Sequence, residues 1–423
     1  MAYWFEDPFL KGVVLPLAVG SAIRGLTTPF STPMIIMGYN ALPEGMVIGP
    51  SAVDFIGNRC PKKRAFIVTD DFSKKFAPKV IRSFETGGFT TETWSGALPE
   101  VPLDTVEECA KAMTEFEPDL IIAIGGGSVM DTAKVSWVRY ERPDITDLRM
   151  LPVLELLGLR KKALLVAVPT TSGTGSECTA FAVVHDVEAN RKVPLVNPDL
   201  VPDFAILDPE FTMDMPPRLT AGTGLDALAH AVDAVSAPIA NELTDAISLE
   251  SIRMVFRYLP RAYKNGRDRE ARQRMLMAAT MAGIGFGNSS TALTHSFGHS
   301  LGSLFHVHHG IAVGIFIPYA LQFYSQVTDK YLAICRALDI NGGSREEGLA
   351  SLVEKVRALM KELDIPLSIK DLGISRDEFD KNLEKLVQYA YEDIDTFVSP
   401  RPITLDQYEK IFRYAYEGRD VDF

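Results

Sequence analysis

The chain has 423 residues, of which 47% are hydrophobic and 23% charged, and its net charge is −12. This length exceeds that of a typical single domain, so we expect two domains and a core large enough to need no disulfide or structural metal. The acidic charge disfavours nucleic acid and anionic membrane surfaces as partners, because phosphate binding requires a basic face.

The N-terminal segment, residues 1–33, is interpreted as an extension. Its apolar stretch at 13–25 contains Pro16 and Arg24 and falls short of the ~20 apolar residues that cross a bilayer. Glu6 and Asp7 precede it, whereas a signal peptide carries positive charge there. The extension either packs against the protein, for example as an oligomer contact, or forms a loosely docked tail.

The first half alternates apolar strands with amphipathic helices. Strands are predicted at 64–71, 120–125 and 163–169, and helices at 105–119, with Asp104 or Thr105 as N-cap, and after the glycines at 125–127. This alternation is typical of a parallel α/β sheet covered on both faces. The chain then becomes almost wholly helical beyond Pro216 and Pro217. We therefore divide it into an extension (1–33), an α/β dinucleotide-binding domain (34–215) and a helical metal-binding domain (216–423).

Three loops of the first half are candidates for binding a dinucleotide. The glycines of "IGGGSVMDTAK" (124–134) follow a strand and open a helix, where backbone N–H groups can hold a phosphate, although a tight turn explains them equally. Asp70 ends a strand, where a carboxylate can bind a ribose diol and repel a 2′-phosphate. "PTTSGTGSE" (169–177) offers hydroxyl groups, or is simply a polar surface loop.

Five of the seven histidines lie between residues 294 and 310. His295 and His299 are four residues apart, as are Asp226 and His230, so each pair shares one helix face. His309 follows a break at 305–310. An isolated histidine is most often a core or surface residue, but three imidazoles and a carboxylate from separate segments can converge on one divalent transition metal ion. His306 and His308 are either neighbours of this site or part of a pocket wall.

These motifs resemble those of the iron-containing (group III) alcohol dehydrogenases, which are related in fold to dehydroquinate-synthase-like proteins. The resemblance covers roughly residues 34–420 and includes "GGGSVMDTAK", "PTTSGTGSE", "GLDALAHAVDA" and "HSFGHSLGSLFHVHHG". It implies an α/β domain with a Rossmann-like parallel sheet, an all-α C-terminal domain, and a homo-oligomeric NAD(H)-dependent alcohol dehydrogenase.

The resemblance also implies roles for individual residues. The implied metal ligands are Asp226, His230, His295 and His309. His299 is implied to be a non-ligand beside the nicotinamide and the substrate, and Asp70 to select NAD over NADP. The residues implied to bind the cofactor are Gly126, Gly127, Ser128, Asp131, Thr170, Thr171, Thr174 and Lys192.

This set of residues predicts a reaction. A divalent metal acts as a Lewis acid on a small primary alcohol while hydride passes to C4 of NAD⁺, in the cleft between the two domains, and His299 relays the proton. Fe²⁺ is the metal that the resemblance implies, and Zn²⁺ and Mn²⁺ suit the same ligand types. The four cysteines are scattered and form no CxxC pair, which indicates a reduced, cytoplasmic protein.

Two other functions are considered. A polyol or hydroxy-acid dehydrogenase of the same superfamily is one, but His230 favours the four-ligand iron type over the three-ligand zinc type. A non-catalytic nucleotide-binding assembly protein is the other, and the retention of every ligand disfavours it. The chain departs from the family at Phe181, which is often polar in relatives. It departs again at "DIDTFVSPRP" (393–402), where relatives more often have Ala-Cys-Thr and Asn-Pro-Arg.

Overall fold

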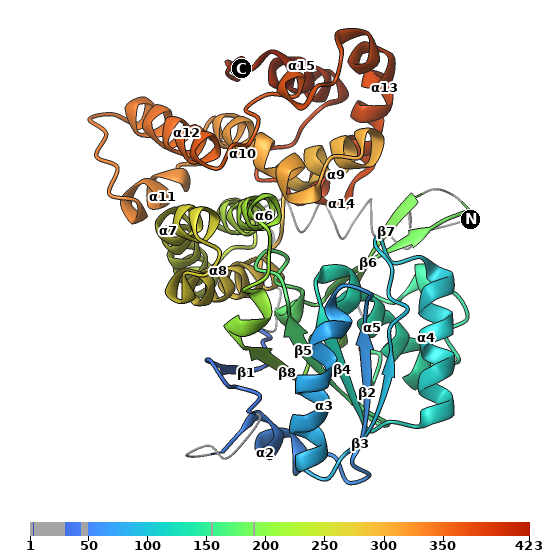
Figure 1. Ribbon diagram of the computed structural model, residues 1–423. Coiled ribbons are helices and arrows are strands. Elements are labelled where there is room, and N and C mark those ends of the chain that lie inside the picture. The colour runs from blue at the N-terminus through green and yellow to red at the C-terminus, as the bar shows by residue number, and fades with distance from the viewer. Residues whose placement is uncertain (1–2, 4–29, 44–49, 154, 189–190) are drawn as a thin grey trace. The chain divides into compact units, whose positions relative to one another are not determined.

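The computed structural model describes Tyr3 and residues 30–43, 50–153, 155–188 and 191–423 (Figure 1). Most of the predicted extension, residues 1–33, therefore lies outside the described residues. The rest divides into two compact units, which we call the sheet unit and the helical unit. The sheet unit ends at Asp214 and the helical unit runs from Met215 to Phe423.

The sheet unit contains a parallel sheet of six strands in the order β1-β8-β5-β4-β2-β3. The central strands are buried on both faces, as their continuous apolar sequences require. This arrangement confirms the predicted α/β first half. The strands are β1 (Met34–Met37), β2 (Arg64–Thr69), β3 (Thr90–Trp94), β4 (Leu120–Gly125), β5 (Leu164–Pro169) and β8 (Phe204–Leu207).

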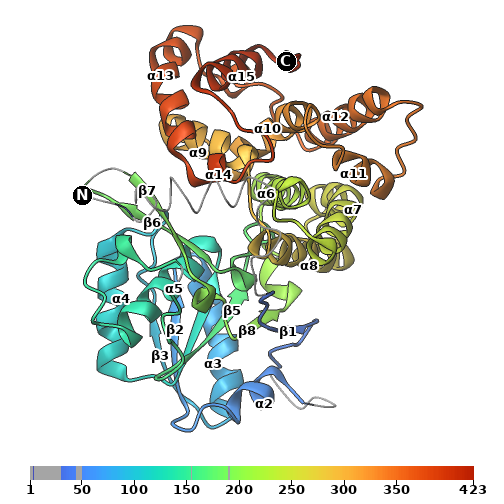
Figure 2. The same ribbon diagram turned by 180° about the vertical axis from the view of Figure 1, so that it is seen from behind.

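Helices cover both faces of this sheet (Figures 1 and 2). On one face α2 (Ala52–Gly57) and α3 (Ala77–Thr86) share a core with alternate residues of β2 and β4. The helices α4 (Leu103–Phe116) and α5 (Gly127–Glu141) pack against one another and against the sheet. The predicted cap of α4 was wrong: Pro102 is the N-cap residue, and Thr105 lies buried inside the helix.

A β-hairpin follows the sheet's fifth strand in sequence and was not predicted. Its strands, β6 (Phe181–Asp186) and β7 (Arg191–Val196), are antiparallel. Pro194 and several charged residues interrupt their apolar pattern, which explains the weak strand signal of this segment.

The helical unit confirms the predicted change of character, because all its regular elements are helices in the described range 215–423. Its core lies around α6 and α10, which are buried along almost their whole length. The helices are α6 (Pro217–Ser236), α7 (Glu242–Lys264), α8 (Arg269–Gly287), α9 (Leu293–Phe305), α10 (His309–Tyr324), α11 (Tyr331–Ala337), α12 (Arg345–Glu362), α13 (Arg376–Glu392), α14 (Ile394–Phe397) and α15 (Leu405–Glu417).

Two glycines allow α6 and α10 to approach closely. A Cβ atom placed on Gly310 would lie 2.0 Å from the backbone oxygen of Gly222 and 3.1 Å from Cβ of Asp226. No side chain fits there, so glycine at 310 brings the first turn of α10 against the middle of α6. No helix in the described ranges combines the length and apolar character that crossing a bilayer requires.

Candidate metal centre and nucleotide-binding loops

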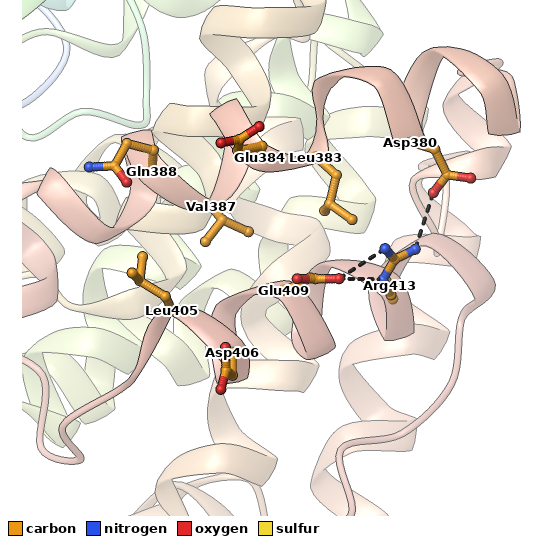
Figure 3. A pocket seen from close by; sticks show the side chains of 9 residues that line it. All are labelled: Asp380, Leu383, Glu384, Val387, Gln388, Leu405, Asp406, Glu409 and Arg413. Atoms are coloured by element: carbon orange, nitrogen blue, oxygen red, sulfur yellow. Dashed lines mark hydrogen bonds and ion pairs between the residues drawn. The ribbon is translucent and has the colours of Figure 1, made fainter.

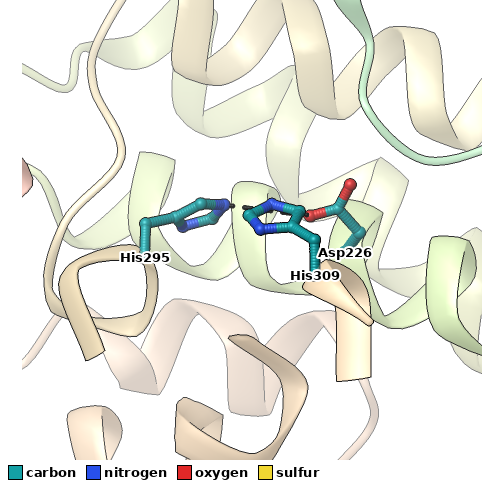
Figure 4. A group of neighbouring side chains, drawn as sticks. All are labelled: Asp226, His295 and His309. Atoms are coloured by element: carbon teal, nitrogen blue, oxygen red, sulfur yellow. Dashed lines mark ion pairs between the residues drawn. The ribbon is translucent and has the colours of Figure 1, made fainter. Parts of the chain in front are cut away.

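The four predicted metal ligands come together in the helical unit. Asp226 and His230 lie one turn apart on α6, His295 lies on α9, and His309 is the first residue of α10. From Oδ1 of Asp226 the nearest ring nitrogens are at 3.2 Å in His309, 3.8 Å in His230 and 3.9 Å in His295. Figure 4 shows Asp226, His295 and His309, whose ligand atoms all lie within 4.8 Å of one another.

Three atoms of this cluster lack the partner that a buried polar atom normally has. Oδ1 of Asp226, Nδ1 of His230 and Nε2 of His295 are buried and accept or donate no hydrogen bond. Such atoms are rare in folded proteins, because each unpaired buried group costs about 1–3 kcal/mol. A divalent cation held by Asp226, His295 and His309 would satisfy the first and third of these atoms, Nδ1 of His230 lies 3.8 Å from the same carboxylate oxygen, and nitrogen and carboxylate donors suit Fe²⁺, Zn²⁺ or Mn²⁺. The residues present therefore fit the implied metal.

The protonation states of these residues also suit a metal. Burial lowers the pKa of His230 to about 3 and that of His295 well below its ordinary value. Burial opposes ionisation of Asp226, but the imidazoles of His230 and His309 outweigh it and lower the pKa of this carboxyl group. At neutral pH His230 and His295 thus present neutral imidazoles and Asp226 presents a carboxylate, which are the forms that bind metal ions.

Asp233 orients the ligand His295 and was not predicted from the sequence. Its Oδ2 lies 3.0 Å from Nδ1 of His295 and accepts a hydrogen bond from the backbone N–H of Ala292 at 2.8 Å. Burial raises the pKa of Asp233 to about 6. Pairing Nδ1 with a carboxylate turns Nε2 of the same ring toward Asp226, as is usual for metal-binding histidines. The available signal was spacing, because Asp233 follows Asp226 by seven residues, or two helical turns.

His299 lies beside the ligand cluster and is not part of it. Its ring stacks on that of His309 with centroids 5.2 Å apart, and its centroid is 5.8 Å from that of His295. Nδ1 of His299 lies 2.9 Å from Oδ2 of Asp393. His306 ends α9 in a left-handed conformation (φ 54°) and His308 precedes α10, so both form the break between the helices.

In the sheet unit, the glycine and threonine loops lie side by side. Gly126 caps α5, and Gly127 and Ser128 form its first turn. A Cβ on Gly126 would lie 3.4 Å from Thr171, and one on Gly127 only 2.9 Å from Thr174. The loops after β4 and β5 therefore meet at the N-terminus of α5, where free backbone N–H groups attract phosphate.

Asp70 lies on the loop after the neighbouring strand, β2. Its Oδ1 accepts a hydrogen bond from the backbone N–H of Ser73 at 2.5 Å. The hydroxyl of Ser73 lies 3.4 Å from that of Thr170, on the threonine loop. The carboxyl ends of three adjacent parallel strands thus bring all three predicted loops together, as in other open α/β sheets.

Asp131 and Lys192 make other contacts. Asp131 accepts hydrogen bonds from the hydroxyl of Ser176 at 2.8 Å and from the backbone N–H of Val183 at 2.9 Å, and burial raises its pKa. It therefore ties α5 to the β6–β7 hairpin. Lys192 lies on β7, and its Nζ is 3.0 Å from a carboxylate oxygen of Glu100.

A surface groove between α13 and α15 is separate from these sites (Figure 3). Its volume is about 390 Å³, and apolar side chains such as Leu383 and Val387 alternate with acidic ones along it. Arg413 bridges Asp380 and Glu409 across it, at 3.1 and 2.9 Å. None of the predicted site residues lines this groove.

A parallel sheet with a glycine-opened helix, together with a site of three histidines and an aspartate in which only His309 is exposed, is the arrangement expected of a metal-dependent dehydrogenase with a nicotinamide cofactor. Residues 43–209 match the family described as iron-containing alcohol dehydrogenase. Residues 220–416 match the C-terminal part of the Fe-containing alcohol dehydrogenase family.

Similarity to individual proteins supports this family match. The chain is 35% identical over 385 residues to an NADPH-dependent butanol dehydrogenase of Clostridium saccharobutylicum, covering 90% of this chain and 99% of that one. It is 36% identical over 389 residues to a bifunctional aldehyde-alcohol dehydrogenase of Escherichia coli K12, covering 85% of this chain but only 43% of that protein. An iron-containing alcohol dehydrogenase of Thermococcus thioreducens superposes with a TM-score of 0.81 at 28% identity, covering 92% and 99% of the two chains. The chain therefore belongs to the iron-containing alcohol dehydrogenase family, which confirms the resemblance.

Proposed function

We propose that the protein oxidises small primary alcohols with NAD⁺ and reduces the corresponding aldehydes in the reverse direction. The observation that carries the proposal is the cluster of Asp226, His230, His295 and His309 in the helical unit, in which one buried polar atom each of Asp226, His230 and His295 makes no hydrogen bond. The name of the relative that acts on butanol supports a small primary alcohol as substrate.

The residues of the candidate metal centre have different roles in this reaction. Asp226, His230, His295 and His309 hold a divalent iron ion, and Asp233 keeps the His295 ring in place. Bound there, the ion supplies Lewis acidity that lowers the pKa of the substrate hydroxyl.

His299 accepts the hydroxyl proton. The O–H bond of the alcohol would break as an N–H bond forms on His299, and NAD⁺, when bound, would accept the hydride of the carbinol carbon at C4, so that aldehyde and NADH would result. The side chain of His299 is 31% exposed, so it can pass the proton on to water.

The loops of the sheet unit are proposed to bind NAD. Backbone N–H groups of Gly126 and Gly127, with the hydroxyl of Ser128, hold the pyrophosphate at the start of α5. The hydroxyl groups of the loop after β5 flank it, from Thr170, Thr171 and Thr174. Asp131 supports this surface by tying α5 to the hairpin, and Lys192 adds a cation on β7.

Asp70 is proposed to select NAD over NADP, because its carboxylate would repel a 2′-phosphate. A polyol or hydroxy-acid dehydrogenase is the second candidate, and the place of His230 at 3.8 Å from Asp226 favours the alcohol dehydrogenase.

We also propose that the protein works in the cytoplasm as a homo-oligomer. All four cysteines are buried and scattered along the chain without a CxxC pair, which suits a reducing compartment. Small-molecule alcohols and aldehydes are its proposed partners, and its acidic surface charge disfavours nucleic acid.

Anaerobic reconstitution with one equivalent of Fe²⁺ tests the proposal. We expect NADH formation with straight-chain primary alcohols between methanol and hexanol, and a loss of at least about 100-fold in His295→Ala, because one ligand is removed. The proposal fails if none of these alcohols is oxidised although the protein holds a stoichiometric metal.

A further inference from the structure

His299 faces two carboxyl groups, that of Asp393 between α13 and α14 and that of Asp395 in α14. Its Nδ1 lies 2.9 Å from Oδ2 of Asp393 and 3.8 Å from Oδ2 of Asp395. The side chain of Asp393 is 18% exposed and that of Asp395 only 9%. Both acidic groups therefore lie in a sheltered environment, directly behind the imidazole proposed to accept the substrate proton.

The other contacts of Asp393 indicate which residue donates the hydrogen bond between His299 and Asp393. Oδ1 of Asp393 accepts a hydrogen bond at 2.9 Å from the backbone N–H of Asp395, since Asp393 caps α14. Its Oδ2 is left for His299. A carboxylate oxygen can only accept, so Nδ1 of His299 carries the proton and the lone pair is on Nε2.

The carboxyl groups of Asp395 and Asp393 differ in pKa. Burial and the neighbouring charge of Asp393 raise the pKa of Asp395 well above its ordinary value. Burial opposes ionisation of Asp393 as well, but the facing His299 lowers its pKa. Asp395 also accepts a hydrogen bond from the hydroxyl of Thr291. The two carboxyl groups therefore differ, because Asp393 ionises more readily than Asp395.

We propose that Asp393 is a positioning residue, which holds His299 in the tautomer whose Nε2 accepts the substrate proton. This inference rests on the proposed function, since it concerns the proton that alcohol oxidation releases.

The substitution Asp393→Asn tests this inference. The amide oxygen stays on the N–H of Asp395, because the opposite orientation would turn two donors against one another. The NH₂ group then faces Nδ1 of His299, and the proton must move to Nε2. We expect kcat to fall about 100-fold, with the alcohol KM changed less than about threefold, since the lost contact acts on proton transfer. Iron content is expected to stay at the wild-type level.

A double-mutant cycle separates positioning from a general structural effect. His299→Ala alone is expected to lower kcat by about 100-fold or more, and adding Asp393→Asn to it should change kcat less than about twofold, because both changes remove the same function. Oδ2 of Asp395 lies 3.8 Å from Nδ1 of His299, beyond hydrogen-bonding distance, so we expect Asp395→Asn to cost far less than Asp393→Asn. Additive losses, or a larger loss for Asp395→Asn, would overturn the inference.

Two further measurements keep the test decisive. In protein labelled with ¹⁵N-histidine, the His299 resonances, identified by their absence in His299→Ala, should report a proton on Nδ1 in the wild type and on Nε2 in Asp393→Asn. If Asp393→Asn does not fold, Asp393→Ser replaces it: the shorter hydroxyl can still cap α14 but cannot reach His299, so the same loss of kcat is expected. If the wild-type protein oxidises no alcohol, both the proposed function and this inference are wrong. If the wild type is active but the losses of kcat caused by the two substitutions are additive, only the inference is wrong.

Discussion

Replacing Gly310 by alanine perturbs the metal centre through the backbone and changes none of the ligand side chains. The new Cβ would lie 2.0 Å from the backbone oxygen of Gly222, whereas an ordinary carbon–oxygen contact is about 3.3 Å. The first turn of α10 must therefore move away from α6 by roughly 1 Å. His309 begins α10 and faces Asp226 at 3.2 Å, so the movement separates two ligands. Metal sites tolerate displacements of only about 0.5 Å.

We expect Gly310→Ala to weaken Fe²⁺ binding by at least about tenfold and to cost about 1–3 kcal/mol of folding stability. Competition with a chelator measures the affinity, and thermal unfolding of the metal-free protein measures the stability. Gly314→Ala is the matched control, one turn along the same helix. Its Cβ would lie 3.1 Å from the side chain of Leu225, which can adjust, so metal affinity should stay within about twofold. Wild-type affinity in Gly310→Ala would refute this account of how α6 and α10 build the site.

Two further substitutions and one labelling experiment test other parts of the structure. His230→Ala should weaken Fe²⁺ binding by more than about tenfold in the same chelator assay, and unchanged affinity would remove His230 from the ligand set. Asp70→Asn keeps an acceptor for the N–H of Ser73 but loses the charge, so kcat/KM with NADP⁺ should rise about tenfold or more in steady-state assays, and no rise would exclude Asp70 as the selector. Burial raises the pKa of Cys60 and Cys109 to about 12, so these thiols remain protonated at pH 8. The folded protein should then not react with a thiol reagent that labels all four cysteines after denaturation, and rapid labelling of the native protein would contradict this.

The sequence was most informative where one property repeats along the chain. The apolar run of β4 is buried on both faces and was readily recognised, whereas β3, with the sequence TTETW, is an edge strand whose polar residues hide it. Short edge strands and hairpins depend on the neighbours with which they pair, and their own residues give little sign of that pairing.

The candidate site was predictable to the extent that its residues share a helix. The spacing of Asp226 and His230 places them on one face of α6, but spacing says nothing about which helix packs against that face. Asp393 lies 94 residues from His299 in sequence, and only the folded chain shows that they meet. Asp233 was overlooked for a related reason, because its role depends on the approach of α9.

The central claim is that Asp226, His230, His295 and His309 close around one cation. Crystals of the Fe²⁺-reconstituted protein, measured at the iron absorption edge, test it most directly. The account predicts a single strong anomalous peak about 2.0–2.3 Å from Oδ1 of Asp226 and from one ring nitrogen of each histidine. A peak elsewhere in the chain, or iron held with Asp226 turned away, would contradict it.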